Sequence, residues 1–329
     1  MNKVKVISEN EVQEIMKGHW AEGLDVIKES FIAREKERVI LPEKTSQIFD
    51  KESSNRINCM PSTLIDEKIC GVKWVSVFPT NYKKNIENVS GVTIISEIET
   101  GKPISIMSST WLTKYRTAGV AVLASKYLSI ENNSSIGFIG AGEEAKMHFE
   151  LFKLIYPDIK VCRVSSRTEK TCEKFIDDFS IEYPDLKFIN CGNDFEKAIK
   201  GSDVIVTAIS GQEPVLKADW IDQANFYVHV GGYEDEYKVA LMSSKIVCDE
   251  WQAVKHRGSQ TLSKMYRDGI IDDSNIYADL SEIIVGNKSG RTSDDSLIYF
   301  NSVGMSYVDV LLAKFVYDNS KDIGKVLYL

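Results

Sequence analysis

Hydrophobic positions change their spacing several times along the chain, and each spacing predicts a different kind of element. Residues 9–38 carry hydrophobic side chains every three to four positions, as a helix does. Between residues 55 and 107 the pattern changes to short β-rich runs separated by turn signals, at 56–60, 69–77, 91–96 and 104–107. This region therefore predicts a curled antiparallel or mixed sheet.

Residues 109–128 return to helical spacing, and a third pattern begins at residue 134. Short hydrophobic runs there alternate with stretches of helical length, at 135–140, 159–164, 186–191, 203–209, 226–231 and 245–249. Such alternation is typical of βαβ units with right-handed crossovers, which form a doubly wound parallel sheet. A last helix over 305–317 has one hydrophobic side, so we expect it to return to the first domain.

The composition is that of a globular protein, with 43% hydrophobic and 27% charged residues in a chain of 329. No run approaches the ~20 apolar residues of a membrane span, and residues 1–15 lack the pattern of a signal peptide. Forty basic and 48 acidic residues give a net charge of −8, which disfavours a nucleic-acid or membrane partner. The six cysteines and four histidines show no metal-ligand spacing, so we expect a reduced cytoplasmic protein without a metal.

The strand expected near residue 135 runs directly into Gly140-Ala141-Gly142 and then into a helix that starts near Glu143. Gly140 permits a tight turn, and Gly142 leaves room for a pyrophosphate to approach the backbone. Ala145 lets the helix pack on the strand, while the helix N-terminus supplies amide donors and a positive dipole. Because the motif opens a series of βαβ units, it predicts dinucleotide binding rather than a simple tight turn.

The next strand ends in residues that bear on the choice of dinucleotide. NAD enzymes usually carry an acid there, which accepts a hydrogen bond from the ribose 2′-hydroxyl. This chain has Ser166, Arg167 and Thr168 instead, which offer hydrogen bonds and a cation to a 2′-phosphate. The sequence therefore favours NADP(H) over NAD(H), and the alternative is that Arg167 is an ordinary surface cation.

Three basic residues before the nucleotide motif are candidates for substrate chemistry. Lys73 lies in the apolar strand over 69–77, where burial would suit proton transfer to or from an amine or imine. Arg116, in the helix over 109–128, has the geometry to bind a carboxylate through two nitrogens. Arg56 stands at the start of the strand over 56–60. Taken singly, each residue is better explained as a cation that faces water.

Several short motifs occur in a fixed order along nearly the whole chain: Met60-Pro61, Val72 to Val75, Ser90 to Val92, Arg116 to Ala118, Ile139 to Gly142, Val230 to Gly232 and Asn301 to Gly304. Together they resemble the ornithine cyclodeaminase/mu-crystallin superfamily. The resemblance implies a Rossmann α/β domain inserted in a second, α+β domain that binds substrate and forms a homodimer. It also implies hydride chemistry at the carbon that bears an amine or imine of a small amino acid.

The resemblance implies domains at 1–118 (first part of the substrate-binding and dimerisation domain), 119–303 (Rossmann NAD(P)-binding domain) and 304–329 (returning helix). It assigns Lys73 and Arg116 to catalysis, facing the substrate carboxylate. Thr117 would lie near the cofactor phosphates, and Ser302 to Gly304 would line the nicotinamide. The expected cofactor-binding residues are Thr117, Gly140, Ala141, Gly142, Glu143, Ser166, Arg167, Thr168, Ala208, Ser302 and Gly304.

Two positions depart from the cyclodeaminase pattern. The Glu that cyclodeaminases carry two residues before Met-Pro is Asn58 here, and the catalytic Asp that follows the later Gly-Gly is Tyr233. The loss of both acids argues against ornithine cyclisation. Glu234 is the first of three acids that follow, and it is the candidate substrate-binding replacement, although a run of acids is also typical of a helix start.

Within the superfamily, further motifs resemble the dehydrogenases that form 2,3-diaminopropionate for siderophores and peptide antibiotics. They are Gly71 to Val75, Lys84 to Glu87, Asp249 to Trp251, Gly290-Arg291 with Asp294-Asp295, and Gly304-Met305. The resemblance implies oxidation of N-(2-amino-2-carboxyethyl)-L-glutamate to an imine, which water splits into 2-oxoglutarate and diaminopropionate. The three carboxylates of this substrate would suit Lys73, Arg116 and either Lys84 or Arg56. These dehydrogenases use NAD, so residues 166–168 are a further departure.

Two alternatives stay open. The same site would serve an NADPH-dependent ketimine or cyclic-imine reductase, because one site catalyses both directions of the reaction. The loss of the acids at 58 and 233 is also compatible with a cofactor-dependent binding protein similar to mu-crystallin.

Overall fold

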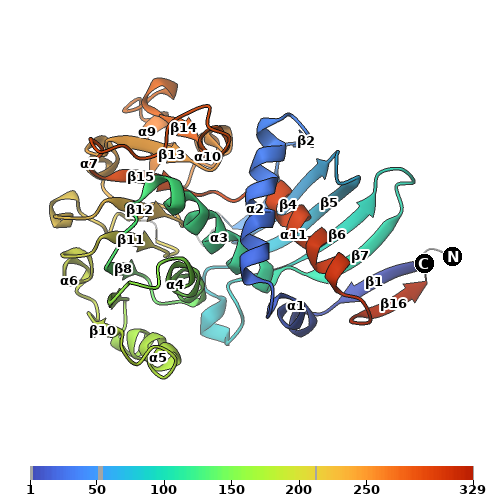
Figure 1. Ribbon diagram of the computed structural model, residues 1–329, viewed down its shortest axis with the longest axis horizontal. Coiled ribbons are helices and arrows are strands. Elements are labelled where there is room, and N and C mark those ends of the chain that lie inside the picture. Colours follow the sequence, from blue (N-terminus) through green and yellow to red (C-terminus); the bar gives the residue numbers. More distant parts are fainter. Residues whose placement is uncertain (1–2, 51–54, 212, 329) are drawn as a thin grey trace. The chain divides into compact units, whose positions relative to one another are not determined.

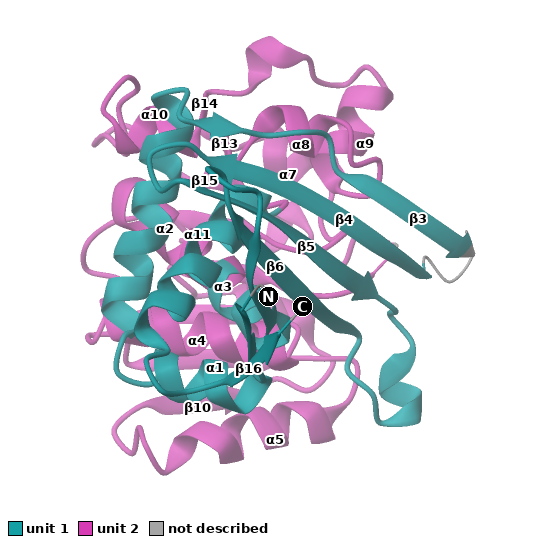
Figure 2. Cartoon of the chain, turned by 90° about the vertical axis from the view of Figure 1, so that its right-hand side faces the viewer, with its two compact units in different colours: residues 1–116, 304–329 teal, residues 117–303 magenta. Residues whose placement is uncertain are grey.

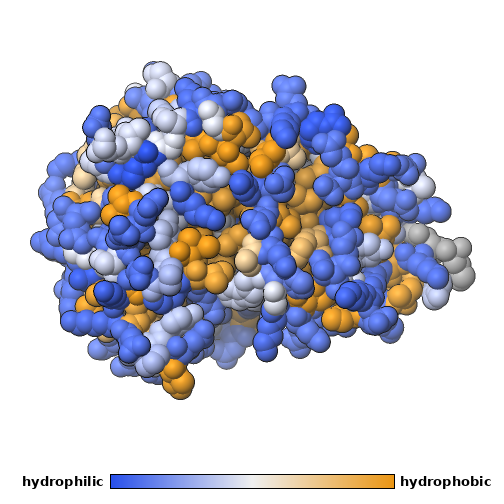
Figure 3. Space-filling model, viewed as in Figure 1, coloured by the Kyte–Doolittle hydropathy of each residue, from blue (hydrophilic) through white to orange (hydrophobic). Residues whose placement is uncertain are grey.

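The computed structural model of the chain describes residues 3–50, 55–211 and 213–328. The chain forms two compact units (Figure 2), which we call unit 1 and unit 2. Unit 1 consists of residues 1–116 and 304–329, and unit 2 consists of residues 117–303. On the face seen in Figure 3, hydrophilic residues cover most of the surface and hydrophobic residues form patches among them.

Unit 1 is built on a mixed sheet with the strand order β16-β1-β7-β6-β5-β4-β2, in which β3 also pairs with β4. Only the pair of β1 and β7 is parallel among the strand pairs of this sheet that the structure describes. The strands are β1 (Lys3–Ile7), β2 (Val39–Ile40), β3 (Thr45–Asp50), β4 (Asn55–Leu64), β5 (Ile69–Val77), β6 (Val89–Glu97), β7 (Pro103–Ser108) and β16 (Lys325–Tyr328). The four runs expected between residues 55 and 107 correspond to β4, β5, β6 and β7.

Helices cover one face of this sheet. They are α1 (Glu9–Met16), α2 (Trp20–Glu35), the first part of α3 (Thr110–Leu128) and α11 (Ser306–Asn319), and a short 3-10 helix η1 (Asn81–Lys84) follows β5. In Figure 1, α2 and α11 lie side by side, and α11 packs on β4, β5 and β6. The helical stretch expected over 9–38 is present as two helices, because the chain leaves the helix between Met16 and Trp20, where Gly18 favours helix poorly.

Unit 2 is built on a parallel sheet with the strand order β10-β9-β8-β11-β12-β15-β13-β14. Its strands are β8 (Ser135–Ile139), β9 (Val161–Ser165), β10 (Lys187–Asn190), β11 (Val204–Thr207), β12 (Phe226–His229), β13 (Lys245–Cys248), β14 (Ala278–Asp279) and β15 (Ile298–Asn301). The order reverses between β8 and β11, which is the mark of a doubly wound Rossmann fold. The predicted fold class is therefore confirmed.

The connections between these strands hold helices α4 (Glu143–Ile155), α5 (Glu169–Ser180), α6 (Phe195–Ile199), α7 (Tyr237–Leu241), α8 (Trp251–Lys255), α9 (Thr261–Arg267) and α10 (Leu280–Ile284), with short 3-10 helices η2 (Ala218–Trp220) and η3 (Asp273–Asn275). Strands β14 and β15 were not predicted. β15 enters the sheet between β12 and β13, out of chain order. No helix in the described ranges is both long and apolar enough to cross a membrane.

Candidate functional site

Lys73 is buried in the face of the unit 1 sheet that α11 covers. It lies on β5 between Met60 of β4 and Thr93 of β6. Alternation along the strand turns Trp74 to the other face, where its side chain is exposed. The Lys73 side chain itself has no exposed surface. A lysine in this position needs a charged partner, because burial penalises an isolated ammonium group.

That partner is Asp309 on α11, a residue that the sequence analysis did not identify. Nζ of Lys73 donates to Oδ1 of Asp309 at 2.6 Å, and Nε of Arg116 donates to the same oxygen at 3.0 Å. Nζ also lies 3.4 Å from Oγ1 of Thr113, which stands three residues before Arg116 on α3. Strand β5 and helix α3 thus each supply one candidate cation to the carboxylate on α11.

Two cations of this cluster, Lys73 and Arg116, contact the same carboxylate oxygen. Lys73, Arg116 and Asp309 are all buried, at 0, 7 and 5% exposure. In the part of the chain that the structure describes, Oδ2 of Asp309 has no hydrogen-bond partner although it is buried. A buried pair of cations attracts an anionic group, because charge interactions are strong away from water. The cluster therefore suits a substrate carboxylate.

Gly304 makes room for the Arg116 guanidinium. The backbone of Gly304 has a φ of +81°, and an added Cβ atom would stand 2.0 Å from Nη1 of Arg116. Any other residue would both strain the backbone and displace the guanidinium. Within unit 1, the position of the Arg116 guanidinium explains glycine at 304, and a place for Gly304 at the nicotinamide stays a prediction.

The two other basic residues expected at the substrate differ in their surroundings. Arg56, on β4, is partly buried and lies on the same sheet face as Lys73, and burial lowers the pKa of its guanidinium. Lys84 stands at the end of η1 and is exposed. The structure therefore groups Lys73 with Arg116, places Arg56 farther along the same face, and leaves Lys84 at the surface.

In unit 2, the glycine motif forms the turn between β8 and α4. Gly140 has a φ of +111°, and a Cβ atom on it would stand 2.5 Å from the carbonyl oxygen of Ala208. A Cβ atom on Gly142 would meet nothing within 4 Å, so open space lies before the N-terminus of α4. Ala145 is fully buried in the first turn of α4. A tight turn, an open approach and a helix N-terminus are the features that a pyrophosphate requires.

Residues at the end of β9 form the second part of this candidate cofactor site. Ser166 is partly buried, and its amide donates to the carbonyl of Gly192 at 2.7 Å. Arg167 and Thr168 are exposed, and Thr168 precedes α5 as its N-cap residue. Glu143, also exposed, begins α4. Ser166, Arg167 and Thr168 therefore suit a phosphate on the ribose better than free ribose hydroxyls, which need a hydrogen-bond acceptor.

Two further residues expected at the cofactor, Thr117 and Ser302, lie close to the ends of unit 2, and Ala208 follows β11. Thr117, next to Arg116 on α3, is buried. Ser302 follows β15 and is 2% exposed, and its hydroxyl donates to Oδ2 of Asp249 at 3.1 Å. The amide of Val303 donates to the same oxygen at 2.8 Å. Asp249 thus holds the segment that leads into Gly304.

Glu234, expected to bind substrate, is fully buried among backbone donors. Its Oε1 accepts from the amide of Ile209 at 2.6 Å, and its Oε2 accepts from the hydroxyl of Thr207 at 2.8 Å and from the amides of Gly231 at 2.9 Å and Val230 at 3.3 Å. Burial raises the pKa of this carboxyl, and the hydrogen bonds from the surrounding donors act in the opposite direction and favour the anion. These contacts tie Glu234 to two strand ends.

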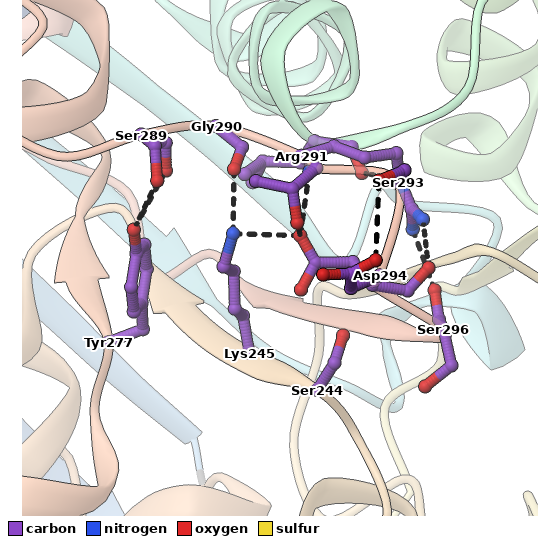
Figure 4. A network of polar contacts seen from close by, with 12 residues as sticks. Ser244, Lys245, Tyr277, Ser289, Gly290, Arg291, Ser293, Asp294 and Ser296 are labelled. Atoms are coloured by element: carbon purple, nitrogen blue, oxygen red, sulfur yellow. Dashed lines mark hydrogen bonds and ion pairs between the residues drawn. The ribbon is translucent and has the colours of Figure 1, made fainter.

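Arg291 and Asp295, which the sequence analysis singled out as a motif, belong to a polar network inside unit 2 (Figure 4). The guanidinium of Arg291 donates to the carbonyl oxygens of Leu128, Asn225, Asp295 and Ser296. Nζ of Lys245 donates to Oδ2 of Asp295 and to the carbonyl of Gly290, both at 2.7 Å. This motif fixes the loop before β15 and contributes no group to the candidate site.

Comparisons with known proteins agree with these features. The ornithine cyclodeaminase/mu-crystallin family matches residues 3–324. An alanine dehydrogenase of Archaeoglobus fulgidus is 29% identical over 97% of this chain and 96% of its own. An N-((2S)-2-amino-2-carboxyethyl)-L-glutamate dehydrogenase of Staphylococcus aureus is 26% identical over 98% of each chain.

A solved structure gives the same result for the fold. The Delta(1)-pyrroline-2-carboxylate reductase of Thermococcus litoralis, in complex with NADH and L-proline, superposes with a TM-score of 0.90 at 25% identity, over 99% of this chain and 100% of its own. The motifs, the doubly wound unit and these relatives lead to one conclusion, which confirms the prediction from the sequence. The chain belongs to the ornithine cyclodeaminase/mu-crystallin family.

Proposed function

We propose that the protein is an NAD(P)-dependent oxidoreductase that acts on the C–N bond of an amino or imino acid. The observation that carries this proposal is the buried cluster of Lys73, Arg116 and Asp309, which combines a carboxylate-binding group with a group that holds a proton. The open glycine turn in unit 2 supports it. So do the relatives, which are named as amino-acid dehydrogenases and as an imino-acid reductase with NADH.

Arg116 orients the substrate by its carboxylate. Asp309 holds the guanidinium through Nε at 3.0 Å, and Gly304 leaves room for the terminal nitrogens, so the plane of the guanidinium is set before substrate binds. A planar, pre-oriented fork binds a carboxylate through two hydrogen bonds at a small entropic cost. The carbon that bears the nitrogen is then held in one position relative to Lys73.

Lys73 donates or accepts a proton at its Nζ atom. The Asp309 carboxylate at 2.6 Å favours the ammonium form, which donates to the substrate nitrogen in the reducing direction. In the oxidising direction the substrate amine must give up a proton when its C–H bond is broken, and neutral Lys73 is the base that accepts it. A nicotinamide cofactor, held by residues 140–142, the N-terminus of α4 and residues 166–168, would supply the hydride acceptor or donor.

The specific substrate that we propose is N-(2-amino-2-carboxyethyl)-L-glutamate. Oxidation at the glutamate Cα breaks one C–H and one N–H bond and leaves an imine, which water splits into 2-oxoglutarate and 2,3-diaminopropionate. The Staphylococcus aureus relative is named for this substrate and is similar over 98% of each chain. Of the three carboxylates, one would bind Arg116, and Arg56 on the same sheet face is the candidate for another.

An imino-acid reductase is the second candidate, and a specific observation favours it. The Thermococcus litoralis relative carries L-proline, the product of reducing a cyclic imine, and superposes over nearly the whole chain. The same three residues would serve this reaction, with Lys73 as the proton donor. The two candidates differ in their substrate and not in the groups that handle it.

We also propose that the protein prefers NADP(H) to NAD(H) and that Arg167 causes the preference. The residue is exposed just after β9, where the 2′-phosphate of the ribose would bind. We expect Arg167→Asp to weaken NADPH binding at least tenfold, because an acid repels the 2′-phosphate, while NADH binding changes little. Titration of protein fluorescence with both cofactors measures this. Lys170→Asp, which makes the same charge change on α5, controls for a general charge effect, and an equal loss in both variants would contradict the assignment.

Two assays that follow the absorbance at 340 nm test the function. In the first, the protein is mixed with NAD⁺ or NADP⁺ and N-(2-amino-2-carboxyethyl)-L-glutamate. In the second, it is mixed with NADH or NADPH and Δ1-pyrroline-2-carboxylate. A rise in the first assay supports the dehydrogenase, and a fall in the second supports the reductase. Flat traces in both assays, with cofactor demonstrably bound, would refute an oxidoreductase of either kind.

Lys73→Met tests the role of the lysine. We expect turnover to fall roughly 10³-fold, because proton transfer is lost, while NADH and NADPH still bind. Lys68→Met, at an exposed lysine of the same unit, should leave turnover unchanged. Turnover near that of the unaltered protein would remove Lys73 from the mechanism.

A further inference from the structure

One carboxylate joins the ends of two neighbouring strands in unit 2. Glu234 follows β12. It accepts hydrogen bonds from Thr207 at the end of β11, from Ile209 just after it, and from Val230 and Gly231 after β12. The two groups contacted near β11 stand on either side of Ala208. The position of Ala208 is therefore determined from both sides by Glu234.

Ala208 in turn packs against the glycine turn. Its amide donates to the carbonyl of Ile139 at 3.0 Å, which extends the ladder between β11 and β8 by one residue. The carbonyl oxygen of Ala208 would lie 2.5 Å from a Cβ atom added to Gly140. Because the strand order reverses between β8 and β11, the ends of these two strands form the crevice in which a doubly wound sheet binds its dinucleotide. Ala208 and Ile209 are partly exposed there and form one wall.

The arrangement requires a carboxylate at position 234. A carboxylate offers two acceptor oxygens, whereas a carboxamide offers one oxygen and an NH₂ group that would face N–H donors. Close packing leaves little room for adjustment, since a Cβ atom on Gly231 would stand 2.1 Å from the carbonyl oxygen of Ile209 and 2.5 Å from Oε1 of Glu234. Loss of the carboxylate would therefore release both strand ends.

We propose that Glu234 is a positioning residue for the dinucleotide: it holds Ala208 and Ile209 against the Gly140 turn and so shapes one wall of the cofactor crevice without touching the cofactor. This proposal rests on the proposed function, because it assumes that unit 2 binds a nicotinamide dinucleotide. It replaces the expectation that Glu234 binds substrate, since the groups around its carboxylate are the ends of two strands.

The test is a fluorescence titration of the full-length protein with NADH and with NADPH, on the unaltered chain and on Glu234→Gln. We expect the dissociation constants of both cofactors to rise roughly tenfold, because at least one hydrogen bond is replaced by a contact between two donors. In turnover, the KM for the cofactor should rise, while kcat at saturating cofactor and the KM for the amino or imino acid stay unchanged.

Glu236→Gln is the matched control. Oε2 of Glu236 accepts from the amide of Ala218, so this variant also removes a carboxylate that binds backbone, two residues away and apart from Ala208. It should bind both cofactors normally. Equal weakening in the two variants, or none in a folded Glu234→Gln, would overturn the proposal.

Thr207→Val provides the test if Glu234→Gln does not fold. It removes the hydroxyl that donates to Oε2 at 2.8 Å while it preserves side-chain size. We expect the cofactor dissociation constants to rise severalfold, and unchanged values would overturn the proposal. If the unaltered protein bound neither NADH nor NADPH, the proposed function itself would fail, which is a different result from a variant that binds as well as the unaltered chain.

Discussion

Lys73, Arg116 and Asp309 show how a buried charge depends on its neighbours. The carboxylate lies 236 positions from Lys73 and 193 from Arg116 in the sequence, yet one of its oxygens contacts both cations. Without Asp309 the two cations would repel each other in apolar surroundings, at a cost of several kcal/mol. The sequence does contain a signal for Asp309, because it is the one charged residue in the apolar stretch from Tyr307 to Ala313. A carboxylate in such a stretch needs a buried cation.

His148 allows a prediction of pH dependence at the residue scale. It is fully buried on α4, its Nδ1 is 2.7 Å from the carbonyl oxygen of Glu144, and burial lowers its pKa to about 4 from 6.5. The unfolded protein therefore binds a proton at this histidine below pH 6.5, whereas the folded protein does so only below about pH 4. Between these values the contribution of His148 to the free energy of unfolding falls as the pH falls.

The measurement is the free energy of unfolding in urea at pH 7.5 and pH 5. We expect the unaltered protein to lose about 2 kcal/mol more between these pH values than His148→Gln does. Comparing the two proteins removes the contribution of Glu234 and Asp235, because burial raises the pKa values of these acids and they act in the opposite direction. Parallel pH dependence in the two proteins would contradict a neutral, buried His148.

At the scale of elements, the loop between α10 and β15 is held by side chains instead of by secondary structure. Arg291 donates to four main-chain carbonyl oxygens from three segments (Figure 4). Lys245, the first residue of β13, donates to Asp295. The loop precedes β15, which enters the sheet between β12 and β13. The Arg291 network thus determines where the last strand of unit 2 begins.

Arg291→Lys should destabilise unit 2 by about 3 kcal/mol, because a lysine cannot reach four carbonyls and leaves buried acceptors unsatisfied. Urea unfolding followed by tryptophan fluorescence measures the change. Arg267→Lys is the control, since the Arg267 side chain is exposed and pairs with the adjacent Asp268, and it should cost less than about 0.5 kcal/mol. A similar small loss in both variants would show that the network does not stabilise the loop.

The elements also show where sequence patterns succeed. Strands β4 to β13 and helices α3 and α11 follow from local periodicity, because each buries a regular set of side chains. Strands β14 and β15 were not predicted, and β14, with two residues, is too short to establish a period. The break between α1 and α2 depends on Gly18, and the apolar spacing continues across it.

For the whole molecule, we propose a homodimer formed through the outer face of the unit 1 sheet. Trp74 and Val92 lie opposite each other on β5 and β6, and both are about two-fifths exposed, at 41 and 40%. Val72 and Ile94 form the next pair on this face and are partly exposed. An apolar sheet face of this kind is typical of a surface that is covered in the functional protein. An archaeal alanine dehydrogenase structure, 28% identical to this chain, is described as a dimer with bound NAD, which supports the proposal.

We expect Trp74→Glu to convert the protein to a monomer, because a second copy would have to bury the new charge. Sedimentation velocity at micromolar concentration measures this. Ile181→Glu makes the same kind of change at a residue of unit 2 that is 90% exposed, and it should leave the dimer intact. A Trp74→Glu protein that sediments as the unaltered protein does would place the dimer interface elsewhere.

The sequence by itself determined the features that depend on near neighbours. Periodicity predicted most elements and the doubly wound sheet, the glycine spacing predicted the turn before α4, and the ordered motifs predicted the family. Only the tertiary structure decided which residues complete each site. Asp309 between Lys73 and Arg116, and Glu234 between the ends of β11 and β12, both depend on contacts between segments that are distant in the sequence. Such contacts depend on topology and packing, so the spacing of residues along the chain does not predict which residues contact each other.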